Sequence, residues 1–169
     1  RSIGSGEMWL THVEGGAGVQ LTKRKTQQKD EGEPAFSPDG RYLYYSRDAT
    51  PGERFEYNKN SSSGIYVIER LDRQTGETKR ITGGPGGAIR PTPSPDGKSL
   101  AFVRRHRGRS ALYIRTLASG VETRVYDHLE RDLQESWAIH GVYPQMAFGP
   151  DSSWLVFWAQ GKIHQIELA

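Results

Sequence analysis

Three copies of one turn sequence determine the fold of this chain: Phe36-Ser37-Pro38-Asp39-Gly40, Pro93-Ser94-Pro95-Asp96-Gly97 and Phe148-Gly149-Pro150-Asp151-Ser152. Proline presets φ at the first central position of a turn. Aspartate bonds back to its own backbone, and glycine adopts the left-handed conformation that closes a hairpin. Ser152 replaces that glycine in the third copy, but we expect the hairpin to form because Pro150 and Asp151 are kept. Three such turns in similar surroundings indicate a repeat.

The composition is typical of a soluble protein with short strands and many loops. Of the 169 residues 34% are hydrophobic and 25% are charged, and the mean hydropathy is −0.72. No apolar run approaches the length of a membrane span, so we expect no membrane insertion. The absence of cysteine excludes disulfides and thiolate metal sites. The first residues contain neither a signal-peptide hydrophobic region nor an initiator methionine, so we expect a mature or excised piece.

An apolar strand is predicted after each turn. Counted from the turn aspartate, a leucine stands at the fourth position and an aromatic residue at the sixth. These pairs are Leu43 and Tyr45, Leu100 and Phe102, and Leu155 and Phe157. A spacing of two places both members on one face of a strand. The residues between them are Tyr44, Ala101 and Val156, also apolar. Each strand is therefore expected to be buried on both faces.

The strands group into the blades of a propeller. A third strand and a short fourth strand follow in each repeat, and four antiparallel strands per repeat are typical of a propeller blade. The fold class we predict is all-β, a partial β-propeller. We expect complete blades at 33–82 and 89–126 and partial blades at 7–22 and 143–168. Closed propellers have about four to eight blades. The chain is therefore predicted to be an open arc, with exposed edges available for self-association.

These repeats resemble those of the TolB-type (WD40-like, PD40) β-propeller, through the motif P-x-F-S-P-D-G-x-x-L-x-Y at 34–45, the strand at 65–68 and the fourth strand at 77–82. More narrowly, the stretches 137–144 and 157–163 resemble the propeller that precedes the catalytic domain of bacterial amidohydrolases. That resemblance implies a periplasmic or secreted parent protein. It also implies a metal-dependent hydrolase domain further along the chain, with its divalent metal bound outside these residues.

No catalytic set is found in this chain. An amidohydrolase metal centre needs clustered histidines, usually beginning with H-x-H, and the five histidines here are scattered. There is no G-x-S-x-G motif of a serine hydrolase, and the glycine-rich stretch 83–87 lacks the Lys-Ser/Thr of a phosphate loop. We interpret Asp39, Asp96 and Asp151 as turn-closing residues and not as cation ligands. His164 is expected to pack as Tyr66 and Tyr113 do. No catalytic, cofactor or metal residue is therefore predicted here.

The binding loops are expected on the face opposite the repeated turns. Strand direction places there the inter-blade connections and the loops between second and third strands, and such loops often carry binding. The candidate residues are Arg54, Phe55, Tyr57, Arg104, Arg105, Arg107, Arg109, Trp137 and His140. We interpret them as a docking face for the remainder of the propeller and a catalytic domain, or for another protein. The alternatives are solvated loops without a partner, or an anionic partner or substrate.

Nucleic acid is not an expected partner. The basic cluster at 104–109 has no interleaved aromatic residue, and acidic residues at 130, 132 and 135 are expected on the same face. Three functions stay open. The chain is a non-catalytic module of a metal-dependent amidohydrolase, a free-standing TolB-like interaction propeller, or the propeller segment of a serine peptidase of the prolyl-oligopeptidase kind. Whether the parent is an enzyme is undecided from these residues, although a hydrolase is favoured.

Overall fold

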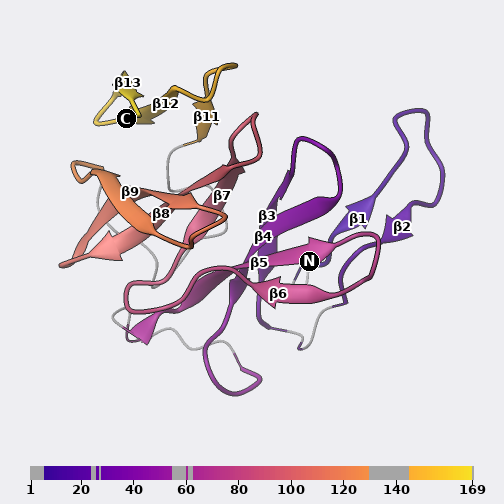
Figure 1. Ribbon diagram of the computed structural model, residues 1–169. Coiled ribbons are helices and arrows are strands. Elements are labelled where there is room, and N and C mark those ends of the chain that lie inside the picture. Colours follow the sequence, from indigo (N-terminus) through magenta and orange to yellow (C-terminus); the bar gives the residue numbers. More distant parts are fainter. Residues whose placement is uncertain are drawn as a thin grey trace.

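The computed structural model describes residues 6–23, 26, 28–54, 60, 63–129 and 145–168, and its elements are all β-strands (Figure 1). The first sheet contains β1 (Trp9–Leu10) and β2 (Val19–Gln20), and the second contains β3 (Glu31–Phe36), β4 (Tyr42–Asp48), β5 (Tyr66–Asp72) and β6 (Thr78–Arg80). The third contains β7 (Ile89–Pro93), β8 (Ser99–His106), β9 (Arg109–Thr116) and β10 (Glu122–Tyr126), and the fourth contains β11 (Met146–Phe148), β12 (Trp154–Ala159) and β13 (Lys162–Glu167). No helix in the described part of the chain could cross a membrane.

The four sheets follow one another in space as they do in sequence (Figure 1). Within each sheet every strand pairs antiparallel with the next strand along the chain. The first strands of successive blades, β3, β7 and β11, lie next to one another, which places them at the inner edge of the arc. Two four-stranded blades are thus flanked by a two-stranded and a three-stranded sheet. This arrangement confirms the predicted partial propeller.

All three repeated turns form hairpins. Gly40 and Gly97 have φ of 69° and 70°, and Ser152 adopts the same left-handed conformation at 64°. Each turn aspartate accepts a hydrogen bond from the backbone nitrogen two residues on. The bonds to Asp39, Asp96 and Asp151 measure 3.1, 3.0 and 3.1 Å. The aspartates therefore close their turns, as predicted.

In the third turn Gly149 stands where the other two turns have a serine, and Ser153 and Trp154 take over the contacts of that serine. Ser37 and Ser94 donate their hydroxyls to the turn aspartates in the first two copies, at 2.5 and 2.6 Å. In the third copy, Ser153 Oγ donates to Asp151 at 2.8 Å instead. The ring of Trp154 fills the space at Gly149, where a Cβ would lie 2.1 Å from the ring. Glycine at position 149 is thus required by the tryptophan packed against it.

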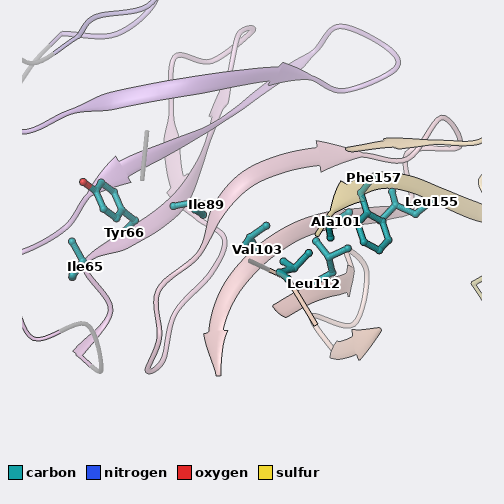
Figure 2. Packing of buried hydrophobic residues seen from close by; sticks show 10 residues of the cluster. Ile65, Tyr66, Ile89, Ala101, Val103, Leu112, Leu155 and Phe157 are labelled. Carbon is teal, nitrogen blue, oxygen red and sulfur yellow. The ribbon is translucent and has the colours of Figure 1, made fainter. Parts of the chain in front are cut away.

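Apolar side chains fill the space between successive blades. Leu43 and Tyr45 pack with Met8, the residue before β1, while Tyr44 points the other way, to Leu100 and Phe102. The next cluster packs Ala101, Val103 and Leu112 of the third sheet against Leu155 and Phe157 of the fourth (Figure 2). Burial of one such large side chain contributes about 1.5–3 kcal/mol. The second strand is therefore buried on both faces in the two complete blades, as predicted.

The two end sheets expose large apolar side chains. Ile163 on β13 is 82% exposed and Val19 on β2 is 63% exposed. Trp158 on β12 and Trp9 on β1 are also exposed. Trp158 and Ile163 correspond by register to Val103 and Leu112 of the third sheet, which are buried against the fourth sheet.

The predicted correspondence of the third strands is wrong in one blade. Phe102 pairs with Tyr113 and Phe157 pairs with His164, but Tyr45 pairs with Glu69. Glu69, and not Tyr66, is therefore the counterpart of His164. Tyr66 pairs with Asp48 at the start of β5 and lies three residues before Glu69. The packing role of His164 is confirmed, since its ring stacks on Phe157 with centroids 5.4 Å apart.

Candidate docking face

Each inter-blade connection contacts the hairpin loop of the blade that follows it. Lys29 Nζ donates to the carbonyl oxygen of Pro51 at 3.2 Å. Arg105 N donates to Gly86 O at 3.0 Å, and Gln160 Nε2 donates to His128 O at 3.1 Å. The described parts of these connections and loops therefore share one face of the arc.

The repeated turns lie together at the other ends of their strands. Asp96 N donates to Ser152 Oγ of the next turn at 3.1 Å. A Cβ at Gly97 would meet the Pro38 ring at 3.9 Å, so these two turns are also neighbours. The repeated turns thus contact one another on one face of the arc, and Arg54, Arg104, Arg105, Arg107 and Arg109 lie on the other, loop face.

Arg104 has a structural role on this face, because it binds backbone carbonyl oxygens of the connection 83–87. Its Nε donates to Gly87 O and its Nη2 to Gly83 O, each at 3.0 Å. Nη1 forms an ion pair with Glu122, which also binds Arg115 at 2.8 Å. The guanidinium lies over the rings of Phe102 and Tyr113. Arg104 therefore holds the connection 83–87 against its blade, and it shares the carboxylate of Glu122 with Arg115.

The other arginines of the cluster lie at the tip of the β8–β9 hairpin. Arg107 and Gly108 both have positive φ, 49° and 79°, as in the type I′ turns that close two-residue hairpins. Arg107 and Arg109 are exposed and Arg105 is half-buried. His106 lies between Arg105 and Arg107 in the sequence, and its Nδ1 is 3.2 Å from the hydroxyl oxygen of Tyr113. The hairpin tip thus presents concentrated positive charge on the loop face.

A second loop carries Arg54. Asp48 at its start is buried, and its Oδ1 accepts bonds from Thr50 N at 2.9 Å and Thr50 Oγ1 at 2.6 Å. Arg47 pairs with Glu69 at 2.5 Å, and Glu69 also accepts from the Tyr45 hydroxyl at 2.9 Å. Further along the same loop, the side chain of Arg54 is exposed. The structure therefore places Arg54 in a separate loop from the 104–109 cluster.

The remaining candidates cannot be placed. Phe55, Tyr57, Trp137 and His140 lie outside the described residues. The structure therefore brings together Arg104, Arg105 and Arg107 with the glycine-rich connection, and it shows Arg54 and Arg109 exposed on the same face.

Sequence reasoning missed a buried ion pair between blades. Arg90 Nε lies 3.0 Å from Glu33 Oε1, and Arg90 N donates to Glu33 Oε2 at 2.9 Å. Ser46 Oγ donates to the same oxygen at 2.6 Å. Both residues precede a proline and have φ near 60°, at bulges in β3 and β7. Glu33 and Arg90 stand 57 residues apart, as Asp39 and Asp96 do. Opposite charges at matched repeat positions were the signal available in the sequence.

Comparison with known proteins identifies the fold. The chain matches no protein-family model. It is 34% identical over 94 residues to the Tol-Pal system protein TolB of Francisella tularensis subsp. holarctica (strain OSU18), covering 54% of this chain and 19% of that protein. The crystal structure of TolB from Acinetobacter baumannii superposes with a TM-score of 0.58 at 20% identity, covering 82% of this chain and 28% of that chain. The chain has a TolB-type β-propeller fold.

This TolB-type propeller segment also resembles part of a longer protein from Bacillus subtilis. Identity to the uncharacterized peptidase YuxL is 30% over 180 residues, covering 90% of this chain and 25% of that protein. The chain thus spans less than a third of the length of each relative. Among the described residues of the TolB-type segment, no three His, Asp or Glu side chains are grouped so that they could hold a metal ion. On the described loop face Arg54, Arg107 and Arg109 are exposed, and their guanidinium groups can form ion pairs and hydrogen bonds.

Proposed function

We propose that this chain is a non-catalytic propeller module of a larger hydrolase and that its loop face docks a second domain. The observation that carries the proposal is the gathering of inter-blade connections and hairpin loops on one face, with exposed Arg54, Arg107 and Arg109. The match of nearly the whole chain to a quarter of a longer protein supports a modular role. Propellers bind partners through such loops because the blades hold them rigidly.

For the second domain we favour a metal-dependent amidohydrolase, which cleaves C–N bonds. The support is the resemblance of the stretches 137–144 and 157–163 to amidohydrolase propellers. The divalent metal would then be bound by that domain, by histidines that include an H-x-H pair. The same resemblance supports a periplasmic or secreted location for the parent protein.

Two other functions have their own support. Similarity to YuxL over 90% of the chain favours a serine peptidase, whose catalytic domain would carry a G-x-S-x-G turn. Similarity to TolB over 94 residues favours an interaction propeller without a catalytic domain. In each case the loop face would bind another protein domain.

The coding sequence that follows Ala169 tests the proposal first. An H-x-H motif supports the amidohydrolase, a G-x-S-x-G motif supports the peptidase, and a stop after further blades supports the TolB-like alternative. In the full parent protein we expect a chelator to abolish hydrolysis, since the metal activates the water. Inhibition by a serine-directed reagent and indifference to the chelator would contradict the amidohydrolase.

The docking role is tested in the same parent protein. Replacing Phe55, Tyr57 and Trp137 together by alanine should weaken contact between the propeller and its second domain, measured by limited proteolysis of the connection between them. Replacing Val13 and Val121 provides a control, because these exposed apolar side chains lie outside the proposed face. Unchanged proteolysis and activity in the first variant would contradict docking through these residues.

A further inference from the structure

The last strand of the fourth sheet has an open edge at the outer rim of the arc (Figure 1). In the second and third sheets a fourth strand, β6 or β10, pairs with the third strand on this side. Among the strands that the structure describes, none pairs with β13 there. Lys162, Gln165 and Glu167 are exposed, and Ile163 is 82% exposed. The outer side of β13 is therefore accessible to a further strand.

Alternate residues of β13 turn their backbone groups toward this edge. Leu168 N donates to Ser153 O at 2.7 Å, and hydrogen-bonded pairs alternate along an antiparallel ladder. The bonds to β12 therefore come from every second residue counted back from Leu168. The residues between them, Ile163, Gln165 and Glu167, direct their N–H and C=O groups to the open side. A row of such groups is a template for strand pairing.

The second sheet shows how the position of Ile163 is covered in a complete blade. Its counterpart by register is Ile68 of β5, since each lies one residue before the partner of the second-strand aromatic residue. Ile68 N donates to Thr82 Oγ1 at 2.9 Å, and Ile68 O accepts from Ile81 N at 2.8 Å. An aliphatic residue followed by threonine thus binds both backbone groups of Ile68.

The first sheet repeats this arrangement with other residues. Met8 N donates to Thr22 Oγ1 at 3.0 Å, and Met8 O accepts from Leu21 N at 2.8 Å. Thr22 and Thr82 are both buried, so the hydroxyl acceptor is held away from water. The third sheet has a bulge at this point and Asp127 in place of the threonine. The aliphatic–threonine pair therefore covers the third strand in two sheets of the arc.

We propose that the open edge of β13 binds an extended segment of a partner protein in which an aliphatic residue is followed by threonine. The segment adds antiparallel, and its aliphatic N–H and threonine hydroxyl meet the carbonyl oxygen and N–H of Ile163. In strand addition, main-chain bonds supply affinity and side chains at set positions supply specificity. The edge lies on the outer rim, so this binding goes beyond the docking proposed for the loop face.

The test uses the 169-residue chain and a blocked hexapeptide, Glu-Thr-Lys-Arg-Ile-Thr, which has the sequence of residues 77–82. Before peptide is added, amide hydrogen exchange should be fast at Gln165 and slow at Ile166, because only the Ile166 N–H is bonded to β12. With millimolar peptide, exchange at Ile163, Gln165 and Glu167 should slow, and their amide signals should shift saturably.

Matched variants separate the threonine and the edge from other contacts. Thr82→Val in the peptide removes the hydroxyl acceptor and should weaken binding about fivefold. Thr78→Val in the peptide makes the same change at a position that pairs with Leu71 in its own sheet, and it should alter binding less than about twofold. In the protein, Ile163→Lys keeps the backbone groups, so the unaltered peptide should bind with similar affinity.

Four results would overturn the inference. The first is the absence of saturable shifts at the edge, and the second is an equal loss of affinity with the two peptide variants. The third is loss of binding in Ile163→Lys, which would place the peptide on the apolar face of the sheet. The fourth is concentration-dependent protection of Gln165 and Glu167 without peptide, which would show that a second copy occupies the edge. The proposed function is decided separately, by the coding sequence after Ala169.

Discussion

The turn aspartates are held by bonds that favour their ionised form. In the second turn, the Ser94 hydroxyl and then the Lys98 backbone N–H donate to Asp96 and lower the pKa of its carboxyl group. The pKa of Asp39 and that of Asp151 are lowered in the same way. The unfolded value is about 3.9. Because the folded pKa lies below it, ionised Asp96 stabilises the fold fully above about pH 4, and this contribution is lost as the pH falls through the folded pKa.

Replacing Asp96 by asparagine should therefore lower the urea midpoint at pH 7. The difference from the wild-type chain should shrink as the pH is lowered below about 4, since the wild-type carboxyl group then loses its charge as well. Glu14→Gln is the control, because Glu14 lies exposed in the loop between β1 and β2. A midpoint difference that is independent of pH would contradict the role of the charge.

The pair Glu33–Arg90 gives a second prediction at this scale. Both side chains are at least nine-tenths buried and join neighbouring blades. Removing one partner leaves the other charge buried without its opposite charge, so Glu33→Gln or Arg90→Met should lower the free energy of unfolding by about 3–5 kcal/mol. The double variant should recover much of that loss, and a double-mutant cycle in urea measures the coupling. Additive losses would show that the two charges act independently.

Among the elements, strands and turns followed from local signals in the sequence, and their connections did not. Alternation of Leu43, Tyr44 and Tyr45 predicts a strand buried on both faces, because each side chain must point to one neighbouring blade or the other. The role of Arg104 could not be read in the same way. Its partners Gly83 and Gly87 come from a connection whose path depends on tertiary packing. A basic cluster in sequence therefore divides, in space, into one structural arginine and several exposed ones.

The predicted alignment of the third strands was wrong because the path of the connection between β4 and β5 also depends on tertiary packing. The segment 49–65 joins β4 to a β5 that starts at Tyr66, opposite Asp48. The local sequence pattern predicts that Tyr66 and Tyr113 are equivalent positions of the repeat, because each follows an aliphatic residue. Register is set by cross-strand hydrogen bonds, and a shift by an odd number of residues moves side chains to the other face. The docking residues Phe55, Tyr57, Trp137 and His140 stay predictions from sequence.

The connection 83–87 supplies the prediction at the scale of elements. Gly86 has φ of 85°, and a Cβ there would clash with Arg105 O, so Gly86→Ala should lower the free energy of unfolding by about 1–3 kcal/mol. Gly83→Ala is the matched control, because nothing lies within 4 Å of its Cβ and its φ is not in the left-handed region. Urea denaturation measures both. Equal losses in the two variants would contradict the close contact between connection and hairpin.

The whole molecule is an arc whose interior faces are covered and whose end faces are not. Leu155 and Phe157 on the near side of the last sheet are buried, while Trp158 and Ile163 on its other side are exposed. Along the inner strands the blades are joined by Glu33 and Arg90, which lie within the arc. Apolar surface at an open end favours association with a matching surface, since burial of such surface contributes about 25 cal/mol per Å².

We therefore expect the isolated chain to associate with its own copies through the end sheets. Its weight-average mass should exceed 19.0 kDa and rise with concentration, as measured by light scattering or sedimentation. Ile163→Lys should reduce association, because a charge on β13 would have to be desolvated at the contact. Val121→Lys is the control, since Val121 is also exposed but lies in the loop before β10, outside the end sheets. A wild-type mass of 19.0 kDa at all concentrations, or equal effects of both variants, would contradict association through the end face.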